Sequence, residues 1–148
     1  MKPIRTYILI ADGARARLLL SEGPGKPLIE VPDSELSQDI KPDREMSAER
    51  PGRVHESATE VRHSIERDDL HRREKERFAQ SLAADLDRRL ANGEYDRLVI
   101  AAAPETLGVI RSALSEKVKA LIFAEVAKDL TKLPNPQIRH HLGDELPI

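Results

Sequence analysis

The chain has 148 residues, 39% hydrophobic and 34% charged, which suits one domain with a core and a heavily solvated surface. Its formal net charge of −2 excludes a strong overall attraction to nucleic acid or to an anionic membrane, so any basic surface must be local. It contains no cysteine, which excludes disulfides and thiolate metal sites. The apolar segment Tyr7–Ala11 is too short for a signal peptide or a membrane span. We therefore expect a single cytoplasmic domain over residues 1–148, with no membrane or DNA partner.

Three strands are predicted near the N-terminus, at Tyr7–Ala11, Ala14–Leu20 and Leu28–Val31. The first is a continuous apolar run, which indicates a buried central strand. Asp12-Gly13 after it is a strong hairpin signal. In the second strand Arg15 and Arg17 alternate with apolar residues, which predicts one solvent-exposed face.

A long polar stretch over residues 32–64 follows the third strand. Most connections inside a compact domain have about 4–6 residues, and a far longer one is usually functional or disordered. At its centre lies Arg50-Pro51-Gly52-Arg53-Val54-His55-Glu56-Ser57. We expect a long mobile loop over about residues 32–64, with its function concentrated in Arg50–Ser57.

The hydrophobic period changes after this loop. An apolar residue recurs every four positions, at Phe78, Leu82, Leu86 and Leu90. This spacing predicts an amphipathic helix over about Asp69–Ala91. Asp68 or Asp69 is expected to cap its start and Asn92-Gly93 to end it.

The C-terminal third continues with alternating elements. The apolar run Leu98–Ala103 predicts a buried strand, and Pro104-Glu105 opens the next helix. Periodicity allows Ser115–Lys132 to form either one long helix or a short helix and then a strand near Leu121–Ala127. A last short helix reaches Leu142. The order β-β-β, long loop, α-β-α-β-α predicts an α/β fold, a mixed sheet of the ribonuclease-H-like kind covered by helices.

Several segments carry a resemblance to a known family: Ala11–Arg17, the Phe78-Ala79 start of the helix face, Arg97–Gly108 and Lys128–Thr131. In this order and spacing they resemble the bacterial host attachment proteins. The element order, with the long loop before the first long helix, resembles the middle domain of archaeal and eukaryotic class-1 peptide-chain release factors. The resemblance covers nearly the whole chain and favours a helix followed by a strand over Ser115–Lys132.

In the release factors the long loop carries a Gly-Gly-Gln tripeptide that helps water hydrolyse peptidyl-tRNA on the ribosome. The nearest counterpart here, Pro51–Ser57, has a single glycine, and the loop has no glutamine after Gln38. The group that would orient the attacking water is missing. Similarity of fold alone does not imply the same activity. The chain is also too short to include a separate domain that reads stop codons.

Binding is therefore the favoured function of the loop. Arg50 and Arg53 would contact phosphates, Gly52 would permit close backbone approach, and His55 completes the candidate binding residues. The leading hypothesis is a non-enzymatic domain that binds ribosomes or tRNA through Arg50–Ser57. The alternative is a protein-interaction or stress adaptor without RNA contact, and a less favoured third is a hydrolase in which His55 and Glu56 activate water. We expect no cofactor.

Metal binding is weakly supported. His55, His63 and His71 are spaced by eight residues, about 12 Å along a helix, which is too far for sharing one ion. Asp12 ends a strand where a ribonuclease-H-like nuclease would place a metal ligand, but Leu98–Ala103 offers no second carboxylate. We therefore expect Asp12 to shape a turn. The alternating charges over residues 66–77 are typical of a solvent-exposed helix with local ion pairs.

Overall fold

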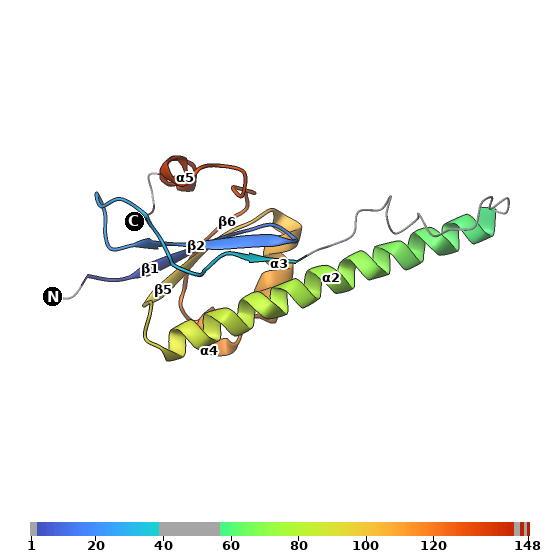
Figure 1. The fold of residues 1–148 in the computed structure, drawn as a ribbon, viewed down its shortest axis with the longest axis horizontal. Helices are drawn as coiled ribbons and strands as arrows, with labels where there is room; N and C mark the ends of the chain where they lie inside the picture. The colour runs from blue at the N-terminus through green and yellow to red at the C-terminus, as the bar shows by residue number, and fades with distance from the viewer. Residues whose placement is uncertain (1–2, 39–56, 144–145, 147) are drawn as a thin grey trace.

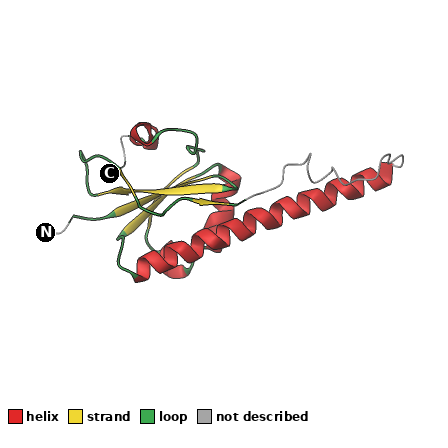
Figure 2. Ribbon diagram, in the orientation of Figure 1, coloured by secondary structure: helices red, strands yellow, loops and turns green. Residues whose placement is uncertain are grey.

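The computed structural model describes residues 3–38, 57–143, 146 and 148. It contains an open mixed sheet of six strands with helices on both faces (Figure 1, Figure 2). The elements in chain order are β1 (Thr6–Ala11), β2 (Arg15–Ser21), β3 (Ile29–Glu30), β4 (Leu36–Ser37), α2 (Ser57–Ala91), β5 (Arg97–Ala101), α3 (Pro104–Ala113), α4 (Glu116–Lys119), β6 (Ile122–Val126) and α5 (Asn135–Leu142). The predicted α/β class is confirmed.

The centre of the sheet is formed by β1 and β5. β1 pairs with β2 in antiparallel orientation and with β5 in parallel orientation, and β6 extends the parallel part. The strand order is β3-β2-β1-β5-β6, with β4 also paired to β2. Ile8 and Leu9, on opposite faces of β1, are 0% and 2% exposed, because helices cover both sides of a central strand. Tyr7–Ala11 and Leu98–Ala103, both predicted as buried strands, therefore lie side by side at the centre of the sheet.

Each face of the sheet has its own hydrophobic core. On one face α2 and α3 pack against the sheet, and Phe78 and Leu86 of α2 are buried there together with Leu9. On the other face α5 covers Ile8, largely through the buried Ile138. The four-residue apolar period therefore correctly identified the side of α2 that faces the sheet.

The start of α2 differs from the prediction. The helix has 35 residues and begins at Ser57, so Asp68 and Asp69 lie inside it and do not cap it. The apolar period marked only the part of the helix that has a buried face. The earlier turns contain good helix formers such as Arg62 and Glu66, but no apolar stripe that would reveal them in the sequence.

The predicted loop over residues 32–64 is consequently ordered at both ends. Residues 57–64 belong to α2, and Leu36–Ser37 forms β4 against β2. Ser34 is buried because its hydroxyl accepts from the Leu18 amide (3.1 Å) and donates to the Leu18 carbonyl (3.3 Å). Residues 39–56 lie outside the described part of the chain.

The remaining elements follow the prediction closely. Residues 115–132 form α4 and β6, so the helix-then-strand alternative is confirmed. α2 ends before Asn92-Gly93, where Gly93 adopts a φ of 70° and the Glu94 amide donates to the Arg89 carbonyl (3.0 Å). β3 is shorter than predicted, with two residues.

The predicted one-sided exposure of β2 is wrong at Arg17. Its guanidinium donates to the Asn135 side chain (2.9 Å) and to the carbonyls of Thr131 (3.0 Å) and Leu133 (2.6 Å). This side of the sheet is covered by α5, so the arginine fastens the segment before α5 to β2.

Candidate functional site

The sequence-predicted binding residues Arg50, Gly52, Arg53 and His55, and the candidate catalytic Glu56, lie outside the described residues. The described chain resumes at Ser57, the first residue of α2. At 1.5 Å per residue this helix is about 52 Å long, and its N-terminal part projects well beyond the sheet (Figure 1). We call residues 57–73 of α2 the arm.

The arm leaves the sheet because the apolar stripe of α2 stops at Phe78. Toward the N-terminus the positions that continue this stripe are occupied by Lys75, His71 and Asp68. A helix segment without a continuous apolar stripe has little to bury against a core. The charge pattern thus determines where the packed part of α2 ends.

The base of the arm is fixed to the sheet by two contacts. The Gln38 side chain donates to the backbone carbonyl of Glu74 (2.9 Å) and to its carboxylate (2.6 Å), while the Gln38 amide donates to Ala14 (2.8 Å). The aliphatic stem of Lys75 lies over Gly13, 3.4 Å from where a Cβ would stand, and its ammonium is 4.0 Å from the Glu105 carboxylate. The arm therefore projects from an anchored point.

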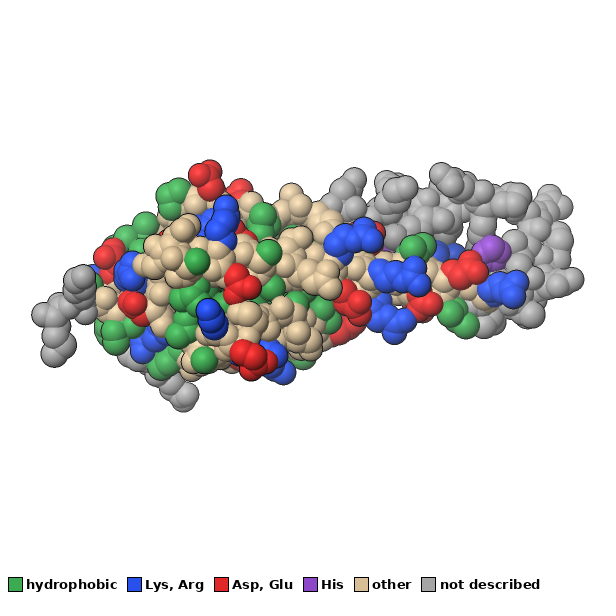
Figure 3. All heavy atoms as spheres, turned by 90° about the horizontal axis from the view of Figure 1, so that it is seen from below, with side chains coloured by type: hydrophobic (Ala, Val, Ile, Leu, Met, Phe, Trp, Pro, Cys, Tyr) green, Lys and Arg blue, Asp and Glu red, His purple; other side chains and the backbone are tan. Residues whose placement is uncertain are grey.

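Charged side chains of both signs cover the arm (Figure 3). Arg67 donates to Ser64 (3.2 Å) and Arg72 pairs with Asp69, each partner three residues away on the same helix. The predicted local pairing of an exposed helix is confirmed, and each such contact adds a few tenths of a kcal/mol. Ile65 and Leu70 are 56% and 45% exposed, so the arm also presents single aliphatic side chains.

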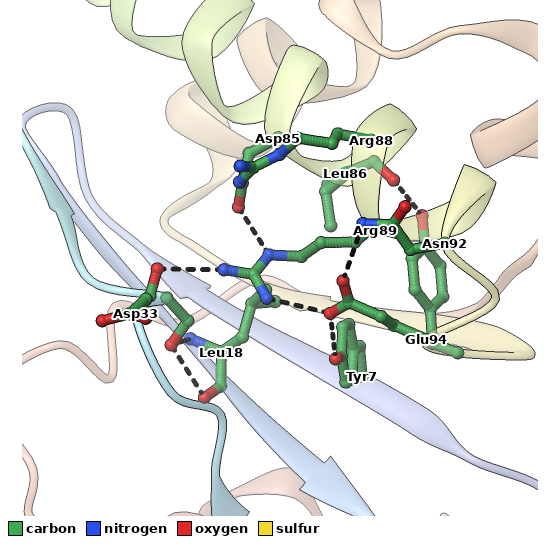
Figure 4. A network of polar contacts seen from close by, with 11 residues as sticks. Tyr7, Leu18, Asp33, Asp85, Leu86, Arg88, Arg89, Asn92 and Glu94 are labelled. Carbon is green, nitrogen blue, oxygen red and sulfur yellow. Dashed lines mark hydrogen bonds and ion pairs between the residues drawn. The ribbon is translucent and has the colours of Figure 1, made fainter.

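A buried polar network holds the opposite end of α2 (Figure 4). Arg89, only 6% exposed, donates to Asp85 (2.8 Å), to Glu94 (3.0 Å) and to the backbone carbonyl of Asp33 (2.9 Å). Glu94 also accepts from the Tyr7 hydroxyl (2.8 Å). The network links α2, β1 and the connection between β3 and β4, and so fixes the direction of the helix. In the sequence, the only indication of this network was the four-residue spacing of Asp85 and Arg89, which is typical of an ion pair on a helix.

The protonation states in this network are set by their surroundings. Burial, followed by the hydrogen bond to Glu94, raises the pKa of Tyr7 from 10.0 to about 12. Burial acts to raise the pKa of Glu94, but hydrogen bonds from Tyr7 and Arg89 outweigh it and hold that pKa below its ordinary value. A neutral phenol, an anionic carboxylate and a cationic guanidinium are the stable combination, which suits a structural role.

Three of the segments that carried the family resemblance meet at one edge of the sheet, beyond the ends of β1 and β6. The Asp12 carboxylate accepts from the amides of Ala14 and Arg15 (both 2.7 Å), which confirms its predicted role in the turn. Its other oxygen is 3.5 Å from the Thr131 hydroxyl, which also donates to Asp129 (2.5 Å). Glu105 joins this edge through Lys75, whose stem covers the turn. The approach of Asp129 to Asp12 was not visible in the sequence.

The histidines and acids of the described residues do not assemble into a metal centre. His63 and His71 lie on the arm, and His63 faces Glu66 at 4.0 Å. Over residues 3–38 and 57–143 no group of three or more histidine, aspartate or glutamate side chains could hold an ion.

An open groove of about 580 Å³ lies between α2 and α3, next to the base of the arm. Glu76 and Gln80 of α2 form one wall, and Gly108, Val109 and Ser112 of α3 the other. The Ser112 hydroxyl donates to the Gly108 carbonyl (3.0 Å) and is therefore not paired with a general base. The groove is better suited to surface contact than to nucleophilic chemistry.

The fold and the arm together define a small α/β domain with a single projecting helix. Residues 7–142 match the model of the family described as "Protein required for attachment to host cells", and the chain belongs to this family. No curated protein matches the chain. Among the described helices, none is long and apolar enough to cross a membrane.

Proposed function

We propose that this chain is a non-enzymatic binding domain of the cytoplasm that associates with ribosomes or tRNA through the Arg50–Ser57 segment. In this proposal Arg50 and Arg53 contact phosphates, Gly52 allows close approach of the backbone, and His55 adds a polar contact. Ser57, to which this segment is joined, stands at the far end of the arm, so a partner that binds there need not contact the sheet.

One observation carries the proposal. Ser57, where the candidate segment joins α2, stands at the far end of a helix whose direction is fixed at both Glu74 and Arg89 (Figure 1). A projecting polar helix does not contribute to the packing of the core, so its presence is better explained by a function. Holding a contact segment at a distance from the sheet, where it can reach a recessed partner, is such a function.

The proposal includes a relation to the release-factor middle domain and to the ribonuclease-H-like folds. It is supported by the antiparallel β1–β2 pair, the parallel β1, β5 and β6, and the polar segment immediately before α2. The catalytic part of the release-factor activity is not included, because the segment lacks the glutamine that orients water.

The test is co-sedimentation of the full chain with purified ribosomes over a series of salt concentrations. We expect binding that weakens as salt rises, and Arg50→Ala with Arg53→Ala should weaken it and flatten the salt dependence. His55→Ala should have a much smaller effect. Release of peptide from charged ribosomes that is abolished by His55→Ala or Glu56→Ala would instead establish the hydrolase alternative.

A second candidate function is contact with a protein and no RNA. The favouring observation is the balance of charge over the arm, four arginines against four acids, together with the exposed Ile65 and Leu70. The same sedimentation series separates the two candidates, because a protein contact of this kind would not show the steep salt dependence of phosphate binding.

A further inference from the structure

The solvent side of α2 carries a row of arginines: Arg62, Arg73, Arg77 and Arg88. They are separated by 11, 4 and 11 residues, close to whole turns of an α-helix, so they lie along one side. This side is opposite the buried Phe78, Leu82 and Leu86, and all four arginines are exposed. Their first and last members are about 39 Å apart along the helix axis. We call these four residues the arginine strip.

The helix has a strong preference for arginine over lysine. α2 contains seven arginines and a single lysine, Lys75, which lies at the base of the arm beside Glu105. Both residue types solubilise a surface, but only the planar guanidinium binds phosphate with two parallel hydrogen bonds. The exclusive use of arginine along the strip therefore favours a partner with phosphate groups over simple solvation.

Acids lie beside the strip. Glu66 is within it, and Asp69, Glu76 and Asp87 lie along its edge by their spacing on the helix. Glu74 pairs with Arg77 (3.2 Å) and Asp85 pairs with Arg88, while both arginine side chains remain 66% exposed. Exposed pairs of this kind are weak and can be exchanged for a stronger anion.

We propose that the arginine strip is a second RNA-contacting surface, which binds phosphates along the length of α2. This inference rests on the proposed ribosome or tRNA association and assigns it an additional set of contacts on described residues. The strip starts on the arm and continues onto the body, so RNA bound at the start of α2 would also follow the helix toward Arg88.

The experiment compares three versions of the full chain for binding to purified ribosomes and to deacylated tRNA. The strip variant carries Arg62→Ala, Arg73→Ala, Arg77→Ala and Arg88→Ala. The matched control carries Lys26→Ala, Lys117→Ala, Lys128→Ala and Lys132→Ala, which removes four exposed cations outside α2. Alanine has the highest helix propensity, so α2 should persist in the strip variant, as circular dichroism can verify.

We expect the strip variant to bind about tenfold more weakly or worse, with a salt slope smaller by roughly 3 units for four lost phosphate contacts. The control should bind nearly as the unchanged chain does. Equal binding of the strip variant and the control, with binding still lost on Arg50→Ala and Arg53→Ala, would contradict RNA binding by the arginine strip. It would leave the proposed function unaffected. Failure of the unchanged chain to bind either RNA would overturn both.

Discussion

At the scale of single residues, Arg89 is the most consequential polar side chain of the described structure. It is nearly inaccessible to water and satisfies two carboxylates and one backbone carbonyl at once. Removing one partner from such a buried group leaves charges without compensation, which is more costly than losing an exposed pair. Its neighbour Arg88 pairs with the same Asp85 but from the surface, and so provides a matched comparison.

We expect Arg89→Ala to lower the free energy of unfolding by about 3 kcal/mol, because Asp85 and Glu94 would lose their buried cation. Arg88→Ala should change it by less than about 0.5 kcal/mol. Urea unfolding of both variants measures the difference. Similar small losses for the two would mean that the network contributes little to holding α2.

The tyrosines give a second prediction at this scale. The two tyrosines of the chain, Tyr7 and Tyr95, stack with their ring centroids 4.9 Å apart, and burial raises the pKa of both, to about 12 for Tyr7. A raised pKa means that the folded state keeps the phenol proton longer than the unfolded state does. The resulting stabilisation is full below pH 10 and is lost as pH rises from about 10 toward 12.

Absorbance of tyrosinate, followed during an alkaline titration, tests this directly. We expect no reversible ionisation around pH 10 while the protein is folded. Tyr7→Phe should remove one of the two delayed ionisations. Two ordinary transitions near pH 10 in the folded protein would contradict the buried hydrogen-bonded arrangement.

The sequence predicted the apolar residues much better than the polar ones. Phe78, Leu82 and Leu86 could be assigned to the core because their spacing reports one side of a helix. The partners of Arg89 and Arg17 could not be assigned, because they come from segments distant in the sequence. A hydrogen bond between segments that are distant in the sequence produces no periodic pattern from which it could be predicted.

At the scale of elements, α2 is one helix with two physical regimes. From Phe78 onward it is held by the core, while the contacts described for the arm are backbone hydrogen bonds and local side-chain pairs such as Arg72 with Asp69. The apolar period in the sequence identified the packed part of α2 and not the arm, because such a period occurs only where a helix faces a core. The same argument explains why β4 was missed, since two residues are too few to show alternation.

Substitutions in the two regimes should differ accordingly. Phe78→Ala, at a position 3% exposed, should lower the free energy of unfolding by about 3–5 kcal/mol. Leu70→Ala, at a position 45% exposed on the same helix, should lower it by less than about 0.5 kcal/mol. Chemical denaturation compares the two, and a loss below 0.5 kcal/mol for Phe78→Ala would show that the packing side of α2 is misassigned.

At the scale of the whole molecule, the sheet acts as a base from which one helix projects. Gln38 and Lys75 hold the point of departure, and the Arg89 network holds the far end of the packed half. The β2–β3 connection, with the exposed Lys26, lies at the opposite end of the molecule from the arm (Figure 1). A partner reached by the arm should therefore be remote from Lys26.

The absence of cysteine from the chain permits the most direct measurement of this claim. A single cysteine introduced by Arg62→Cys on the arm, or by Lys26→Cys at the opposite end, can carry a photoactivated crosslinker. With purified ribosomes we expect crosslinks to RNA from position 62 and few from position 26. Crosslinks to RNA from position 26 and none from position 62 would contradict the account, because the body and not the arm would then be the contact surface.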